Sequence, residues 1–119
     1  MIDKREWRRV DVDFEAECSC LNMPKEKFTV RVINLNESGL CFAAPSSVHP
    51  CHKMTMTFDL KGEGTVSLDV KIVWSGYFEK PGEYRTGVKI TQASDEDHEK
   101  FLRYYYLALA TFTQKNQGF

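Results

Sequence analysis

Three arginines near the N-terminus could bind a phosphorylated ligand. Arg5, Arg8 and Arg9 fall within five consecutive residues, just ahead of the first stretch with a regular apolar pattern. A guanidinium group is a planar fork of hydrogen-bond donors that fits phosphate oxygens and the O6/N7 edge of guanine, and it can also stack on a purine. The same residues fit an arginine-rich start that only keeps the chain soluble, so the residues alone leave both interpretations open.

A polar turn at residues 34–39 offers groups of a different kind. Its sequence, Asn-Leu-Asn-Glu-Ser-Gly, separates two apolar stretches. Asn34 and Asn36 can donate to and accept from the edge of a base, and Gly39 lets a ligand approach the main chain. An ordinary hairpin turn explains the same residues, and this alternative also stays open.

The elements that must position these groups are mostly β-strands. Apolar and polar residues alternate strictly over 10–20, with four carboxylates on the polar side, and this period predicts a half-buried strand with a solvated acidic face. Residues 21–25 carry turn residues and are expected to form a loop, as are residues 76–83 with their Pro-Gly pair. Alternation or short apolar runs predict the remaining strands, at 28–33, 40–44, 54–60, 66–74 and 84–90.

The chain is expected to end in an amphipathic helix. Ser94 with Asp97 three residues later resembles a capping box, and aromatic and aliphatic residues then recur at helical spacing to Phe112. We therefore predict a mostly β fold, a small six-stranded antiparallel barrel with one C-terminal α-helix, over residues 10–113. A flexible arginine arm at 1–9 precedes this domain, and a frayed tail at 114–119 follows it.

Composition limits the classes of partner. The formal net charge is −1, which disfavours a protein that coats nucleic acid through bulk positive charge. A small barrel that binds single strands would need a basic aromatic groove, whereas most aromatics here fall at core-facing positions. No apolar run is long enough to cross a bilayer and the N-terminus lacks the apolar centre of a signal peptide, so we expect a cytoplasmic protein without membrane insertion.

The four cysteines are expected to be free thiols, because a reducing cytosol keeps them so. Cys18 and Cys20 are separated by a single residue, which is not the spacing of a zinc knuckle. His49 and His52 flank Cys51 and could add ligands, but packing is the commoner role of scattered Cys and His, and no metal or cofactor is expected.

Nor does the sequence present the groups of an enzyme. It contains no glycine-rich phosphate loop and no HExxH pair, and no nucleophile is followed by a matched base. We therefore expect a binding protein.

The two clusters, in this order, resemble the signature of the PilZ domain family, RxxxR followed by [D/N]xSxxG. Arg5 and Arg9 match the first motif, and Asn34 with Gly39 match the second. The resemblance continues downstream through Val-Lys-Ile-Val-Trp at 70–74 and the Gly-containing strand at 84–90, so it covers nearly the whole chain. In this frame Asn36 replaces the Ser of the motif; a competing frame beginning at Asn36 recovers Ser38 but places Cys41 at the Gly position.

The resemblance implies a bacterial receptor for the second messenger cyclic di-GMP. Arg5 and Arg9 would hold the phosphates and guanines, Arg8 would raise the local potential or assist, Asn34 and Asn36 would contact a guanine edge, and Gly39 would keep the turn open. A downstream protein partner is implied as well. The number of nucleotides stays open, and the Asn36 substitution keeps a second interpretation open, a degenerate PilZ-like adaptor that binds protein but not the nucleotide.

Overall fold

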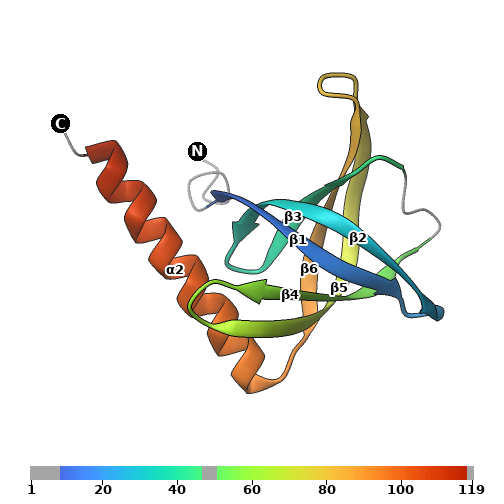
Figure 1. The fold of residues 1–119 in the computed structure, drawn as a ribbon, viewed down its shortest axis with the longest axis horizontal. Helices are drawn as coiled ribbons and strands as arrows, with labels where there is room; N and C mark the ends of the chain where they lie inside the picture. Colours follow the sequence, from blue (N-terminus) through green and yellow to red (C-terminus); the bar gives the residue numbers. More distant parts are fainter. Residues whose placement is uncertain (1–8, 47–50, 118–119) are drawn as a thin grey trace.

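The computed structural model of the chain, which describes residues 9–46 and 51–117, is a closed antiparallel barrel with one long helix beside it (Figure 1). The strand order around the barrel is β1-β2-β3-β6-β5-β4. The predicted fold class is therefore confirmed. The elements are β1 (Val10–Cys20), β2 (Met23–Asn36), β3 (Gly39–Ala44), β4 (Lys53–Leu60), β5 (Gly64–Phe78), β6 (Glu83–Gln92) and α2 (Asp95–Gln117).

Strand β1 shows why the alternating pattern folds as it does. Its apolar side chains face the barrel interior, and its acidic side chains are exposed. One of these, Glu17, forms an ion pair with Lys27 on β2 at 3.4 Å, with both side chains in solvent. The acidic row is thus the solvated face that the pattern predicts, and surface pairs of this kind add little to stability.

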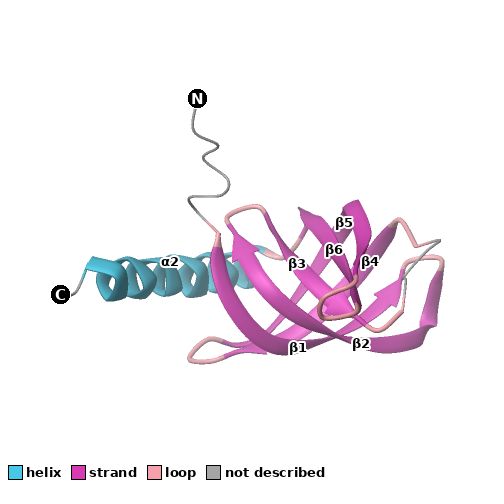
Figure 2. Cartoon of the chain, turned by 90° about the horizontal axis from the view of Figure 1, so that it is seen from above, coloured by secondary structure: helices cyan, strands magenta, loops and turns pink. Residues whose placement is uncertain are grey.

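Helix α2 begins where its capping residues predict. Ser94 Oγ accepts a hydrogen bond from the backbone N–H of Asp97 at 3.1 Å, which satisfies one of the free donors of the first turn. Phe101 and Tyr105 are fully buried against the barrel. Figure 2 shows the helix along one side of the barrel, with its C-terminal part extending past the strands. The helix ends at Gln117, four residues beyond the end at residue 113 that the sequence predicts for the domain.

Two strands are longer than the sequence pattern indicates. Strand β2 already begins at Met23, inside the expected 21–25 loop, because the tight turn at Leu21 lets Cys20 pair with Met23. Strand β5 continues to Phe78 and pairs with β6 as far as Glu83, so the expected 76–83 loop shrinks to a four-residue turn. Main-chain pairing between β5 and β6 overrides the Gly and Pro signals there.

The expectation of four free thiols is wrong for two of them. The structure joins Cys20 and Cys51 in a disulfide, with Cα atoms 5.8 Å apart. The pairing follows from topology: Cys20 at the end of β1 lies opposite Met54 on β4, which brings the residues just before β4 beside it. Cys18 and Cys41 are free and buried. In the described part of the chain, no group of three or more His, Cys, Asp or Glu residues could hold a metal ion.

Burial controls the reactivity of Cys18. Desolvation, with a smaller contribution from the Glu17 carboxylate, raises the pKa of the thiol to about 12. At pH 8 only about one thiol in ten thousand would then be ionised, against roughly one in four for an unperturbed cysteine. We expect iodoacetamide at pH 8 to leave Cys18 unmodified in the folded protein and to label it in urea, as read by peptide mass spectrometry. Equal labelling in both conditions would contradict the buried position.

None of the described helices is both long enough and apolar enough to cross a bilayer.

Candidate functional site

A surface pocket of about 430 Å³ is lined by Asn34 and Asn36 of the second motif and by Arg9, the last arginine of the first motif. It is formed by Arg9 ahead of β1, by the β2–β3 turn and by the adjoining parts of β5 and β6. Its lining residues are Arg9, Asn34, Asn36, Ser38, Leu40, Cys41, Val73, Trp74, Gly87, Val88 and Lys89.

Two β-bulges aim side chains into this pocket. One interrupts the pairing of β2 with β3 between Val32 and Asn34, and the other interrupts the pairing of β5 with β6 between Ile72 and Trp74. An extra residue reverses the alternation of faces, so that a side chain that would have pointed inward points outward. Val32 is buried in the core, whereas Asn34 and Trp74 line the pocket.

The Asn36 side chain shapes the turn itself. Its Oδ1 accepts a hydrogen bond from the backbone N–H of Ser38 at 2.9 Å and a second from Ser38 Oγ at 3.2 Å. This is an Asx turn, in which a side-chain carbonyl takes the place of a main-chain acceptor. The amide nitrogen of Asn36 is the part of the side chain left to donate to a ligand.

Gly39 serves the packing of strands. It begins β3 opposite Lys89, and a Cβ built on it would overlap the carbonyl oxygen of Val88 and lie 3.1 Å from Lys89 Cα. The residue does not line the pocket, and its φ is outside the left-handed region. A position that tolerates no side chain favours the frame that places the motif glycine at Gly39 over the frame that places it at Cys41.

Trp74 is a pocket residue that the sequence analysis did not single out as one. Its indole lies over Gly87, where a Cβ would come within 2.6 Å of Trp74 Cε2 and 2.7 Å of Cδ1. The ring remains substantially exposed while held against the β6 main chain. A fixed, exposed aromatic face next to arginine and asparagine is a platform on which a base can stack. The signal available in the sequence was a Trp ending an apolar strand and a Gly in the returning one.

Electrostatics favour an anion in this pocket. Arg9 and Lys89 line it, and none of its described lining residues carries a carboxylate. The buried Cys41 thiol at its floor has a raised pKa because burial outweighs the nearby guanidinium groups of Arg85 and Arg9, so Cys41 adds no negative charge.

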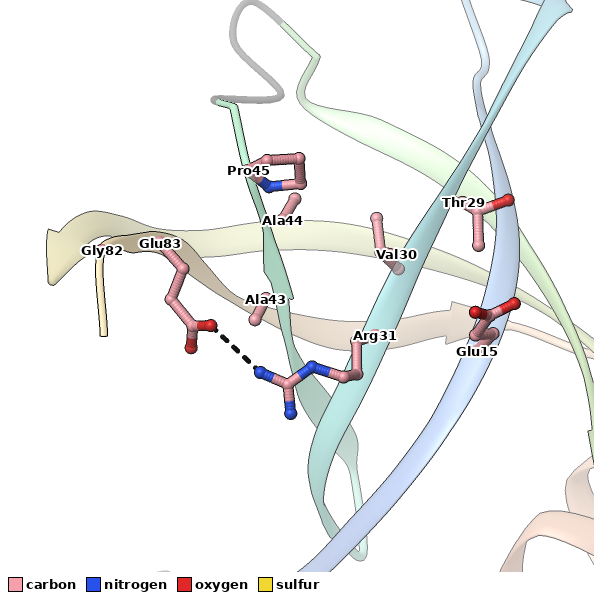
Figure 3. Close-up of a pocket in the computed structure, with 9 residues that line it drawn as sticks. All are labelled: Glu15, Thr29, Val30, Arg31, Ala43, Ala44, Pro45, Gly82 and Glu83. Atoms are coloured by element: carbon pink, nitrogen blue, oxygen red, sulfur yellow. Dashed lines mark hydrogen bonds and ion pairs between the residues drawn. The ribbon is translucent and has the colours of Figure 1, made fainter. Parts of the chain in front are cut away.

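Neighbouring hollows are electrostatically different. One of about 440 Å³ shares Arg9 and Asn34, but two carboxylates, Asp11 and Asp13, lie there among its three arginines, Arg9, Arg31 and Arg85. Another of about 350 Å³ lies across β2 and β3 (Figure 3), where Arg31 Nη2 and Glu83 Oε1 form an ion pair at 3.0 Å. Because the lining of the latter holds two carboxylates, Glu15 and Glu83, against the single cation Arg31, it offers little to an anionic ligand.

Of the predicted site residues, the structure brings Arg9, Asn34 and Asn36 together at one pocket and places Gly39 behind it. Arg5 and Arg8 lie outside the described residues.

Comparison with known proteins gives the same family that the two motifs resemble. The family model for the PilZ domain matches residues 3–107. No curated protein sequence matches the chain.

Solved structures share the fold at low sequence identity. The PilZ domain of YcgR from Escherichia coli, described with c-di-GMP, has a TM-score of 0.64 and 9% identity, over 92% of this chain and 93% of that one. The inhibitor of motility MotI/DgrA of Bacillus subtilis has a TM-score of 0.73 and 12% identity, over 87% of this chain and 50% of that one. PlzA of Borreliella burgdorferi, in complex with c-di-GMP, has a TM-score of 0.62 and 12% identity, over 93% of this chain and 54% of that one. This chain therefore spans about half the length of MotI and of PlzA.

Proposed function

Because the chain belongs to the PilZ domain family, we propose that it is a bacterial receptor for cyclic di-GMP and binds the nucleotide in the pocket beside Arg9. The observation that carries the proposal is the convergence of Arg9, Asn34 and Asn36 on a single pocket that has cationic lining residues and no described carboxylate. Neighbours of the same fold are described in complex with c-di-GMP.

The roles follow from the chemistry of each group. The Arg9 guanidinium suits a phosphate or the O6/N7 edge of guanine, and Arg5 and Arg8 would add donors from the N-terminal arm. Asn34 and the amide nitrogen of Asn36 suit the edge of a base, and Trp74 offers a face for stacking. Gly39 acts indirectly, by allowing the turn to lie close against β6.

Recognition of this kind involves no reaction. We infer that the output is a change in the surface offered to a downstream protein partner when the nucleotide is bound. The Cys20–Cys51 disulfide lies at the end of β1 remote from Arg9, and neither cysteine lines the pocket.

One observation favours a second candidate, an adaptor that binds protein without the nucleotide. Asn36 Oδ1 is already engaged by the backbone N–H and the hydroxyl of Ser38, so the residue standing in place of the motif Ser has one acceptor fewer for a ligand. The likeness in fold to an inhibitor of motility is compatible with such a role.

Titration calorimetry separates the two candidates. We expect saturable heat with cyclic di-GMP, no saturable heat with GTP, and loss of binding in an Arg5→Ala/Arg9→Ala double variant that melts at the same temperature as the wild type. The fitted ratio counts the nucleotides. An absence of heat with cyclic di-GMP into the high micromolar range would reject the receptor and leave the adaptor.

A further inference from the structure

Strands β5 and β6 extend beyond the barrel wall as a hairpin, which projects at the top of Figure 1. The pairing of β4 with β5 ends at Lys71, and one more hydrogen bond joins the Ile72 N–H to the His52 carbonyl at 2.8 Å. From there to Phe78, β5 pairs with β6 on one side. On the other side, no strand in the described part of the chain pairs with it.

The main chain of this free edge can accept another strand. In an antiparallel strand the amide and carbonyl groups of successive residues point alternately to the two sides. Every second residue between Trp74 and Phe78 therefore directs both groups away from β6. Such a row of unpaired donors and acceptors is a template for another extended chain.

The side chains of this edge are apolar and exposed. The exposed fractions are 63% for Val73, 45% for Trp74, 57% for Tyr77 and 39% for Phe78, four of the eight large exposed hydrophobic residues in the described part of the chain. Natural edge strands are commonly protected by a charged residue or a proline, and neither occurs from 73 to 78.

Neighbours on β6 hold the rings in place. The Arg85 guanidinium lies 4.6 Å from the centre of the Phe78 ring, and Arg85 Nε donates to Glu83 Oε2 at 2.9 Å. Tyr77 packs against Tyr84 with ring centres 5.1 Å apart. The apolar surface is therefore ordered before any partner arrives, which lowers the entropy lost on association.

We propose that this edge pairs with the same edge of a second copy of the chain, antiparallel and about a two-fold axis. Two copies related in this way donate and accept the same set of hydrogen bonds, so the edge is complementary to itself. Exposed Lys71 precedes the edge, and exposed Glu79 and Lys80 follow it. Antiparallel pairing brings Glu79 of each copy towards Lys71 of the other.

Gly76, in the middle of the edge, leaves room for the rings. No atom lies within 4 Å of a Cβ built on Gly76, whereas Trp74 and Phe78 stand two residues away on either side. The large rings of one copy can therefore lie over the glycine of the other. This pairing joins the hairpins of two otherwise separate barrels, and it uses Val73 and Trp74, which also line the pocket beside Arg9.

Sedimentation velocity of the full chain without nucleotide tests the proposal. As concentration rises, we expect the wild-type mass to move from the 13.8 kDa of one chain towards twice that value. Tyr77→Lys should stay at the mass of one chain over the same range, because it places a charge in each half of the interface. The matched control is Leu107→Lys, an equally drastic change at an exposed position on α2, which should associate like the wild type.

Amide hydrogen exchange of the wild type gives a second test that needs no variant. Amides at alternate positions of 73–78 should exchange more slowly at high concentration, while those of 64–70, already paired with β4, should not change. A wild type with the mass of one chain at every concentration, or an association that Tyr77→Lys leaves intact with no change of exchange at 73–78, would overturn self-pairing. If the wild type has the mass of one chain at every concentration, the edge would instead be available to a strand of a different protein.

Discussion

Replacing Arg9 with alanine is expected to weaken cyclic di-GMP binding by roughly 10- to 100-fold, which corresponds to one or two hydrogen bonds to a charged group. Arg9 is the one arginine of the first motif in the described residues, and it stands where the cationic pocket adjoins its neighbour. Arg9→Lys should fall between the wild type and the alanine variant, because it keeps the charge and loses the planar fork. Calorimetry at a fixed salt concentration measures all three affinities.

The control for this experiment is another exposed arginine. Arg103 on α2 makes ion pairs with Glu63 at 3.0 Å and Glu99 at 3.6 Å and lines none of the pockets described above. Arg103→Ala should bind the nucleotide like the wild type. If Arg9→Ala and Arg103→Ala bind equally well, the pocket beside Arg9 is not the binding site, even if the protein proves to be a receptor.

The second large effect concerns stability. Gly39→Ala is expected to lower the free energy of unfolding by about 3 kcal/mol and the melting temperature by roughly 10 °C. The added methyl group would overlap the Val88 carbonyl oxygen. Val88 belongs to β6, which pairs with β3 on one side and with β5 on the other. A main-chain atom held in a barrel cannot move aside as the end of a flexible side chain can.

Gly76→Ala provides the matched comparison for thermal unfolding, followed by circular dichroism. Its Cβ would meet no atom within 4 Å, and its φ is not left-handed, so its melting temperature should stay close to that of the wild type. Equal melting temperatures for the two alanine variants would show that β3 and β6 do not approach each other as closely as described.

Local patterns predicted the fold well because most strands here carry a solvated and a buried face. The alternation from Val10 to Cys20 and the Ser94 cap each depend on residues near one another in the chain, and both were correct. The disulfide of Cys20 with Cys51 was missed because it depends on which strands become neighbours when the barrel closes, and no local pattern encodes that.

The candidate site was predictable only in part, for a related reason. Asn34 and Asn36 were found from their motif, but a bulge is needed to turn Asn34 outward, and a single inserted residue leaves little trace in an alternating sequence. Trp74 was missed as a site residue because its place depends on contact with Gly87 on another strand. Only the outer end of the projecting hairpin, residues 76–83, is predicted as a loop, because its Gly and Pro residues outweigh the weak alternation around them.

The pocket has a consequence for how this domain can change over time. Its polar and aromatic residues all lie outside the buried core, and its shape is set by main-chain features; they are Arg9, Asn34, Asn36, Ser38, Trp74 and Lys89. Substitutions at exposed positions that make no special contact, such as Arg9 and Lys89, usually alter stability by less than about 0.5 kcal/mol. Ligand preference can therefore drift, or disappear, while the barrel stays intact, so that receptor and adaptor are separated by very few mutations.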